Sequence, residues 1–289
     1  MSNTYTPTTG FTVIRCSGRD TQEFLQNQLT GDVAGIREPD WGLSGYCSPK
    51  GRLLAIFFVC RQGADFLLLT DASIAEGVLA RLRMYVLRAE VTLELCPEQS
   101  LAFKNKKTDE LPEAAISGNL PVLRDALTIG VAAKASPDNS YGDRLFRKLC
   151  IESGIPVLSA ALSEMFIPQS LNLDLVDGVS FQKGCYPGQE VVARVRYRGA
   201  PKQRMIGASM EITHAPTPGT EVNCRDGASG RNGTVVCAVS GPDMRQALLL
   251  ASVPVAVLKH PGSEGLSIAG LPLTVHPFPY PVPLEVQRS

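Results

Sequence analysis

The chain has 289 residues, in which 28 lysines and arginines balance 28 aspartates and glutamates. A chain of this length exceeds what one hydrophobic core usually supports, so two or three domains are expected. The charge balance removes any global electrostatic argument for binding to nucleic acid or a membrane surface. No apolar run is long enough to span a bilayer, and the polar first ten residues do not resemble a secretion signal, so a cytoplasmic protein is expected.

The first hundred residues predict an α+β unit with short links. Thr30-Gly31 is expected to end its first helix, because glycine permits a left-handed cap, and Ser48-Pro49-Lys50-Gly51 is expected to turn a hairpin. The expected elements are a strand at 11–15, a helix at 20–29, hairpin strands at 43–47 and 52–60, a strand at 65–70, a helix at 72–86 and a strand at 90–95.

Residues 101–200 predict a second α+β unit, and residues 201–289 an all-β domain. In the second unit we expect an exposed loop at 104–110, a strand at 127–132 and a helix at 141–153, which Gly154-Ile155-Pro156 ends. After residue 201 prolines recur, helical periodicity is lost and short alternating runs suit a small barrel. The expected barrel strands are 205–212, 220–224, 233–239, 246–251 and 266–275.

The stretch Lys183-Gly184-Cys185-Tyr186-Pro187-Gly188-Gln189-Glu190 is the part of the chain most suited to chemistry. Pro187 fits the first turn of a helix, which places Cys185 near a helix N-terminus. The helix dipole and the Lys183 ammonium would both stabilise a thiolate there, and Gly184 would let a ligand approach the backbone. A lone cysteine is more often a small buried hydrophobe, but the flanking glycines and the lysine favour a functional interpretation.

Cys185 has no obvious protein partner in the sequence. The eight cysteines form no C-x-x-C pair, so neither a zinc site nor a cluster site is predicted, and most of these thiols are expected to be reduced core residues. His214, His260 and His276 all fall in the last domain, which argues against a Cys-His hydrolase. The thiol could attack an activated carbon, join a mixed disulfide or transiently ligate iron. The sequence is consistent with all three roles.

A cluster of basic residues follows the motif. A polyanionic ligand could bind it through charge-assisted hydrogen bonds, although a solvated surface is the commoner explanation of such a run. Its position next to Cys185 favours the ligand. The cluster consists of Arg194, Arg196, Arg198, Lys202 and Arg204.

The motif from Lys183 to Glu190 closely resembles the signature of the YgfZ family, folate-binding proteins related to the glycine-cleavage T-protein, an aminomethyltransferase. The resemblance implies a ring of two intertwined α+β units, here 1–100 and 101–200, with a small C-terminal β-barrel at 201–289. Tetrahydrofolate, or a one-carbon derivative of it, would lie in the central opening. Further matching stretches are Leu29-Thr30-Gly31-Asp32-Val33, Pro49-Lys50-Gly51-Arg52, Gly154-Ile155-Pro156 and Tyr197-Arg198-Gly199.

The resemblance also implies an accessory role in synthesis or repair of iron–sulfur clusters in a subset of enzymes, including enzymes that thiolate tRNA. The expected partners are folate and iron–sulfur enzymes such as tRNA-modifying radical enzymes, with no direct nucleic-acid binding, no membrane and a monomeric state. The alternative is a folate-dependent one-carbon transferase acting on a small amine or tRNA. A third reading is a noncatalytic adaptor, for which Cys185 and Lys183 would be dispensable.

One departure from the T-protein pattern bears on the activity. The T-protein keeps a catalytic aspartate shortly after the hairpin glycine, whereas the matching stretch here is Gly51-Arg52-Leu53-Leu54-Ala55. An apolar residue cannot carry a proton or stabilise an iminium-like intermediate, so aminomethyltransferase activity is not expected.

The predicted site combines two reactive residues with a set of folate contacts. Cys185 and Lys183 are the reactive pair, while Gly184 and Tyr186 belong to the folate contacts in the same motif. Arg194 and Arg198 are expected at the glutamate tail of folate. Gln189 and Asn172 could hydrogen-bond a pterin, with structural capping an equal alternative for each. Relatives often carry Arg-x-Glu before Gly-x-Pro; here Cys150-Ile151-Glu152 retains only the acid, so Glu152 is either a pterin contact or a charged helix-end residue.

Overall fold

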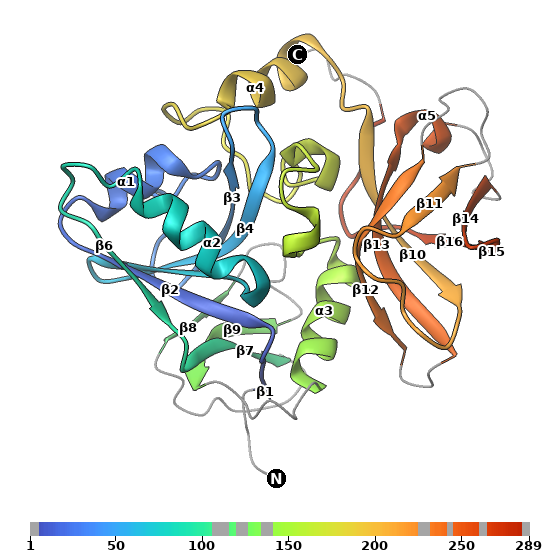
Figure 1. Ribbon diagram of the computed structural model, residues 1–289, viewed down its shortest axis with the longest axis horizontal. Coiled ribbons are helices and arrows are strands. Elements are labelled where there is room, and N and C mark those ends of the chain that lie inside the picture. The colour runs from blue at the N-terminus through green and yellow to red at the C-terminus, as the bar shows by residue number, and fades with distance from the viewer. Residues whose placement is uncertain are drawn as a thin grey trace.

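The computed structural model describes residues 6–105, 116–119, 127–133, 141–224, 232–241, 245–259 and 265–284. His260 and most of the loop expected at 104–110 lie outside these residues. Figure 1 shows a first sheet with two helices on one side of the molecule, a second β domain on the other side and α3 between them. Within the described ranges, no helix is long and apolar enough to cross a membrane.

Five antiparallel strands form the first sheet, and α1 (Thr21–Gln28) and α2 (Ala72–Arg83) cover one of its faces. All the strands and helices expected up to residue 96 are present, with ends shifted by a few residues. β4 is buried from Leu53 to Cys60, as its unbroken apolar run predicts. The strand order is β3 (Trp41–Cys47), β4 (Leu53–Gln62), β5 (Asp65–Asp71), β2 (Phe11–Ser17) and β6 (Thr92–Cys96).

A second, four-stranded sheet and α3 (Tyr141–Ser153) pack on the other face of the first sheet. The ring centroid of Phe146 on α3 lies 5.2 Å from that of Phe11 and 5.4 Å from that of Phe103. Phe146 therefore packs against a residue of each sheet. The intertwined ring and the three domain boundaries stay predictions. The strand order is β1 (Thr6–Pro7), β7 (Gln99–Asn105), β9 (Leu127–Ala133) and β8 (Ile116–Asn119).

The C-terminal strands form a nearly closed seven-stranded barrel, as expected. The strand expected at 266–275 is instead three short strands, because the Ala269-Gly270 pair has positive φ and turns the chain back. Short helix α5 (Val255–Leu258) follows β13. The order is β15 (Leu271–Pro272), β14 (Leu266–Ile268), β11 (Glu221–Cys224), β12 (Gly233–Ser240), β13 (Gln246–Pro254), β10 (Gln203–Glu211) and β16 (Thr274–His276).

Arg204 and Tyr280 are among the residues that join the barrel to the rest of the chain. Arg204 at the start of β10 is 4% exposed, and its Nη1 lies 2.7 Å from Oδ1 of Asp174. Including Arg204 in an exposed basic cluster is therefore wrong, because this side chain pairs with the buried carboxylate of Asp174. The Tyr280 hydroxyl donates to the carbonyl of Gly154, 2.6 Å away, just after α3.

Candidate functional site

The motif loop leads into α4 (Gln189–Arg198), which lies over the turn between β3 and β4 (Figure 1). Gly188 is the N-cap, with φ of 79°, so the helix begins two residues after Pro187. The expectation that Pro187 occupies the first helical turn is wrong. Glycine at the cap allows a left-handed backbone that proline cannot adopt, and this places Cys185 three residues before the cap.

Gly188 contacts the hairpin turn at Gly51, so two stretches of the family resemblance meet here. A Cβ on Gly188 would lie 2.5 Å from the carbonyl oxygen of Ser48 and 2.6 Å from Cα of Gly51. Gly51 also has positive φ, 68°, and a Cβ on it would lie 2.8 Å from Cβ of Val191. Only glycines permit this approach of the two backbones, which fixes the motif loop against the first sheet.

Cys185 is the most accessible of the eight cysteines, all of which lie in the described part of the chain. Its side chain is exposed, whereas Cys96 and Cys224 are half-buried and the other five are buried. Burial raises the pKa of the thiols of Cys47 and Cys60 to about 12, because an apolar environment disfavours a thiolate. Cys185 therefore combines an open approach with a fixed backbone.

Lys183 anchors the loop to the end of α1. Its Nζ donates to the carbonyl oxygen of Leu29 at 2.7 Å and to that of Gly31 at 2.8 Å. Burial lowers the pKa of this amine to about 8, and the charge of Asp32 opposes that change. The two acceptors are backbone groups more than 150 residues away in sequence, which no local pattern around Lys183 indicates.

Tyr186 packs beside Lys183 and carries an unused polar group. Its ring centroid lies 5.6 Å from Nζ of Lys183, and only 6% of the residue is exposed. Burial raises the pKa of its phenol, and the buried hydroxyl has no hydrogen-bond partner among the described residues. A buried hydroxyl without a partner is costly, so this atom is a candidate for contact with a ligand or water.

The segment after α1 is hydrogen-bonded to the residues that precede the motif loop. The hydroxyl of Thr30 donates to the carbonyl of Gly178 at 2.6 Å and accepts from the amide of Gly45 at 2.8 Å. The amide of Ser180 donates in turn to the carbonyl of Thr30 at 2.8 Å. These bonds connect the segment of Thr30 to the residues that precede Cys185 in the chain.

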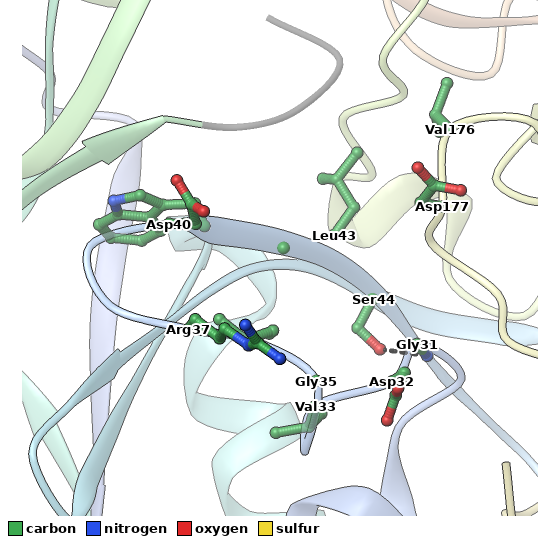
Figure 2. Close-up of a pocket in the computed structure, with 13 residues that line it drawn as sticks. Gly31, Asp32, Val33, Gly35, Arg37, Asp40, Leu43, Ser44, Val176 and Asp177 are labelled. Atoms are coloured by element: carbon green, nitrogen blue, oxygen red, sulfur yellow. Dashed lines mark hydrogen bonds between the residues drawn. The ribbon is translucent and has the colours of Figure 1, made fainter. Parts of the chain in front are cut away.

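A cavity of about 300 Å³ opens beside this segment. Figure 2 shows Leu43 and Ser44 on β3 between the loop of Gly31 and Arg37 on one side and Asp177 on the other. Ser44 accepts a hydrogen bond from the amide of Gly31 at 2.7 Å. Gly31 lines the cavity, and its carbonyl accepts a hydrogen bond from Lys183 of the motif loop. The motif loop is therefore bonded to the wall of the cavity.

The remaining predicted site residues do not all converge on the motif. Gln189 begins α4, and Arg194 on the same helix pairs with Glu190 at 2.8 Å, whereas Arg198 forms no hydrogen bond or ion pair in the described ranges. Glu152 is exposed on α3, where it pairs with Lys148 at 2.5 Å, the helix-end role left open by the sequence. Its contact with a pterin stays a prediction.

Asn172 has a structural role in the fold. It is fully buried in the left-handed conformation, with φ of 55°. Its Nδ2 donates to the carbonyl of Met205 at 2.9 Å, and its Oδ1 accepts from the amide of Met205 at 3.2 Å. Both ends of the amide thus pair with β10, which matches the capping alternative.

The position at which the T-protein carries its aspartate holds no acid in this chain. Leu53, Leu54 and Ala55, where the T-protein would carry its aspartate, are buried apolar residues. Among the described residues, no group of three or more histidine, cysteine, aspartate or glutamate side chains is placed to hold a metal ion.

Comparison with known proteins places the chain among its relatives. A tRNA-modifying protein YgfZ from Escherichia coli O157:H7 is 30% identical over 255 residues, which cover 78% of each chain. One from Cronobacter sakazakii is 30% identical over 82% of this chain and 80% of its own. The chain belongs to the YgfZ family. No protein-family model matches it.

The fold of this YgfZ family member is that of the T-protein. The glycine cleavage system aminomethyltransferase T from Bartonella henselae superimposes with a TM-score of 0.63, covering 93% of this chain and 83% of its own. Only 14% of the aligned residues are identical, so this likeness concerns the fold alone.

Proposed function

We propose that this protein is a cytoplasmic, tetrahydrofolate-binding accessory factor for synthesis or repair of iron–sulfur clusters in a subset of enzymes, including enzymes that thiolate tRNA. One observation carries the proposal. The Cys185 thiol is exposed on a loop that Lys183 and Gly188 fix in place, while every other cysteine is at least half-buried. The relatives described as tRNA-modifying proteins support the connection with tRNA.

The residues around the motif fit a folate. The Tyr186 hydroxyl is buried and has no partner in the part of the chain that the structure describes, so a polar group of a ligand would give this atom a hydrogen bond. The nearby cavity of about 300 Å³ has the size of a small ligand site, and the carboxylates of Asp32 and Asp177 can accept the N–H donors of a pterin. Tetrahydrofolate, when bound, supplies one-carbon or reducing chemistry that no side chain possesses.

Each residue of the motif then has its own task. Lys183 holds the loop to the end of α1, Gly184 leaves open space for a ligand to approach, and Gln189 offers amide hydrogen bonds. Arg194 and Arg198 are exposed cations for the glutamate tail of folate. Cys185 is the reactive or ligating thiol.

A one-carbon transferase acting on a small amine or tRNA is the second candidate function. The T-protein fold and the folate fit favour it, but transfer to an amine needs a group that moves a proton. At the position of the T-protein aspartate, Leu53, Leu54 and Ala55 provide none, which favours the accessory role.

The test has two parts. Calorimetry measures the binding of tetrahydrofolate to the protein and its variants. A second assay measures whether each variant restores the activity of an iron–sulfur enzyme that thiolates tRNA. Tyr186→Phe removes only the unpartnered hydroxyl, and we expect it to weaken folate binding by about five- to tenfold. Cys185→Ser should retain folate binding yet fail to restore enzyme activity. Absence of folate binding by the unaltered protein would refute the proposal, and so would full activity with Cys185→Ser.

A further inference from the structure

We propose that the exposed side of α4 and the neighbouring hairpin tip bind an unpaired segment of RNA directly. This RNA face extends beyond the folate site, with which it shares Arg194 and Arg198, and it rests on the proposed function only for the kind of polyanion that binds there. It departs from the sequence-based expectation of no direct nucleic-acid contact. The RNA face consists of Lys50, Arg52, Arg194, Arg196, Tyr197, Arg198 and Lys202.

Most of α4 is not used by the fold. Val192 is the only buried residue of this ten-residue helix. The helix is held at its start by the Gly188–Gly51 contact and below by Gln169, whose Nε2 donates to the carbonyl of Val192 at 2.7 Å. Half of its side chains are exposed and available to a partner: Glu190, Arg194, Arg196, Tyr197 and Arg198.

The RNA face concentrates positive charge in a chain whose net charge is zero. It contains six cations, against which α4 provides one acid, Glu190, already paired with Arg194. The side chains of Lys50, Arg198 and Lys202 are exposed and form no hydrogen bond or ion pair within the described ranges. Unpaired cations of this kind are the usual contacts of phosphates.

An oriented aromatic ring lies within these cations. Tyr197 is 65% exposed, and its ring centroid lies 6.2 Å from that of Phe181 in an edge-on arrangement. The guanidinium of Arg196 lies 5.3 Å from the centroid of the same Phe181 ring. Phe181 thus positions both side chains before any ligand binds, and tyrosine and arginine are the residues on which unpaired bases stack.

These features favour RNA over an acidic protein partner. The core of a protein interface is usually depleted of charge and rich in apolar contacts, whereas the seven residues of the RNA face include no aliphatic side chain. An unpaired loop offers both phosphates and free base faces, which a duplex does not. RNA bound to α4 would lie beside the loop that exposes Cys185.

The test is fluorescence anisotropy with a labelled RNA stem-loop and with labelled oligouridine, at several salt concentrations. Tyr197→Ala should weaken binding of both RNAs about 5- to 100-fold, because a stacking platform is lost. The double variant Lys50→Ala/Lys202→Ala should reduce the slope of log affinity against log salt by about 1.4 units, about 0.7 for each lysine on an unpaired strand. Tyr85→Ala/Arg88→Ala, an exposed aromatic and cation after α2, is the matched control and should bind like the unaltered protein.

The outcomes separate this inference from the folate proposal. Folate binding without measurable RNA binding overturns the RNA face alone, and RNA binding without folate binding overturns the folate site alone. If polyglutamate competes as well as RNA and Tyr197→Ala changes nothing, the face serves an acidic protein and the RNA proposal is wrong. Unchanged thermal midpoints of the variants show that any loss of binding is not unfolding.

Discussion

Gly188 and Gly51 lie backbone against backbone, although 137 positions separate them in the sequence. Both have positive φ, and a Cβ on Gly188 would lie 2.6 Å from the backbone nitrogen of Gly51. The cap of α4 and the hairpin turn are thereby fixed relative to each other. The thiol of Cys185 owes its position to this contact rather than to its own neighbours in the sequence.

Gly188→Ala should destabilise the protein by about 1–3 kcal/mol, because alanine adds both a clash and backbone strain. Thermal or chemical unfolding measures this loss. Gly184→Ala is the matched control within the same motif, since a Cβ there meets nothing within 4 Å. If Gly184→Ala destabilises as much as Gly188→Ala, the backbone contact is not what fixes the loop.

The amine of Lys183 should give stability a specific pH dependence. Burial lowers its pKa to about 8, whereas an unfolded chain has the ordinary lysine value of about 10.4. Between these values the unfolded state holds more protons, so the free energy of unfolding rises with pH. Chemical denaturation of the wild type and of Lys183→Met should show a difference that grows in favour of the wild type from pH 8 to 10. A difference that stays flat over this range would contradict the buried anchor.

One thiol should react well before the others in the folded protein. Cys185 is exposed, while burial raises the pKa of Cys47 and Cys60 to about 12, where almost no thiolate exists at neutral pH. Timed alkylation with iodoacetamide, followed by peptide mass spectrometry, should label Cys185 first and Cys96 and Cys224 more slowly. Equal early labelling of a buried cysteine would show that the fold does not protect it.

Asn172→Ala should cost at least about 2 kcal/mol of stability, because it leaves the amide and carbonyl of Met205 buried without partners. Glu152→Gln, on the exposed side of α3, should stay within about 0.5 kcal/mol of the wild type. Urea unfolding curves measure both changes. A normal stability of Asn172→Ala, combined with lost folate affinity, would instead make Asn172 a ligand contact.

Local patterns in the sequence are enough to find most elements of the fold. α3 has the predicted bounds, Tyr141–Ser153, because apolar spacing and the following Gly154-Ile155-Pro156 define it without help from the rest of the chain. β7 and β8 were missed: Gln99–Asn105 and Ile116–Asn119 have weak alternation, and they are strands because β9 pairs with both.

The candidate site is less predictable, since its contacts join distant segments. The motif itself identifies Cys185, but the partners of Lys183 are carbonyls at the end of α1. Arg204 belongs by sequence to a basic run, and only Asp174, brought near by the fold, explains its burial. The match of Thr30-Gly31-Asp32 to the family pattern is the one sequence signal that indicates the segment to which Lys183 binds.

The measurement that tests the central claim most directly is tRNA thiolation in cells that lack the protein and carry a variant copy. The account predicts that Cys185→Ser fails to restore thiolation while accumulating as folded protein. Cys224→Ser, which alters a half-buried cysteine of the barrel, should restore it fully. Full restoration by Cys185→Ser would contradict the claim that the exposed thiol performs the function and would favour a noncatalytic adaptor.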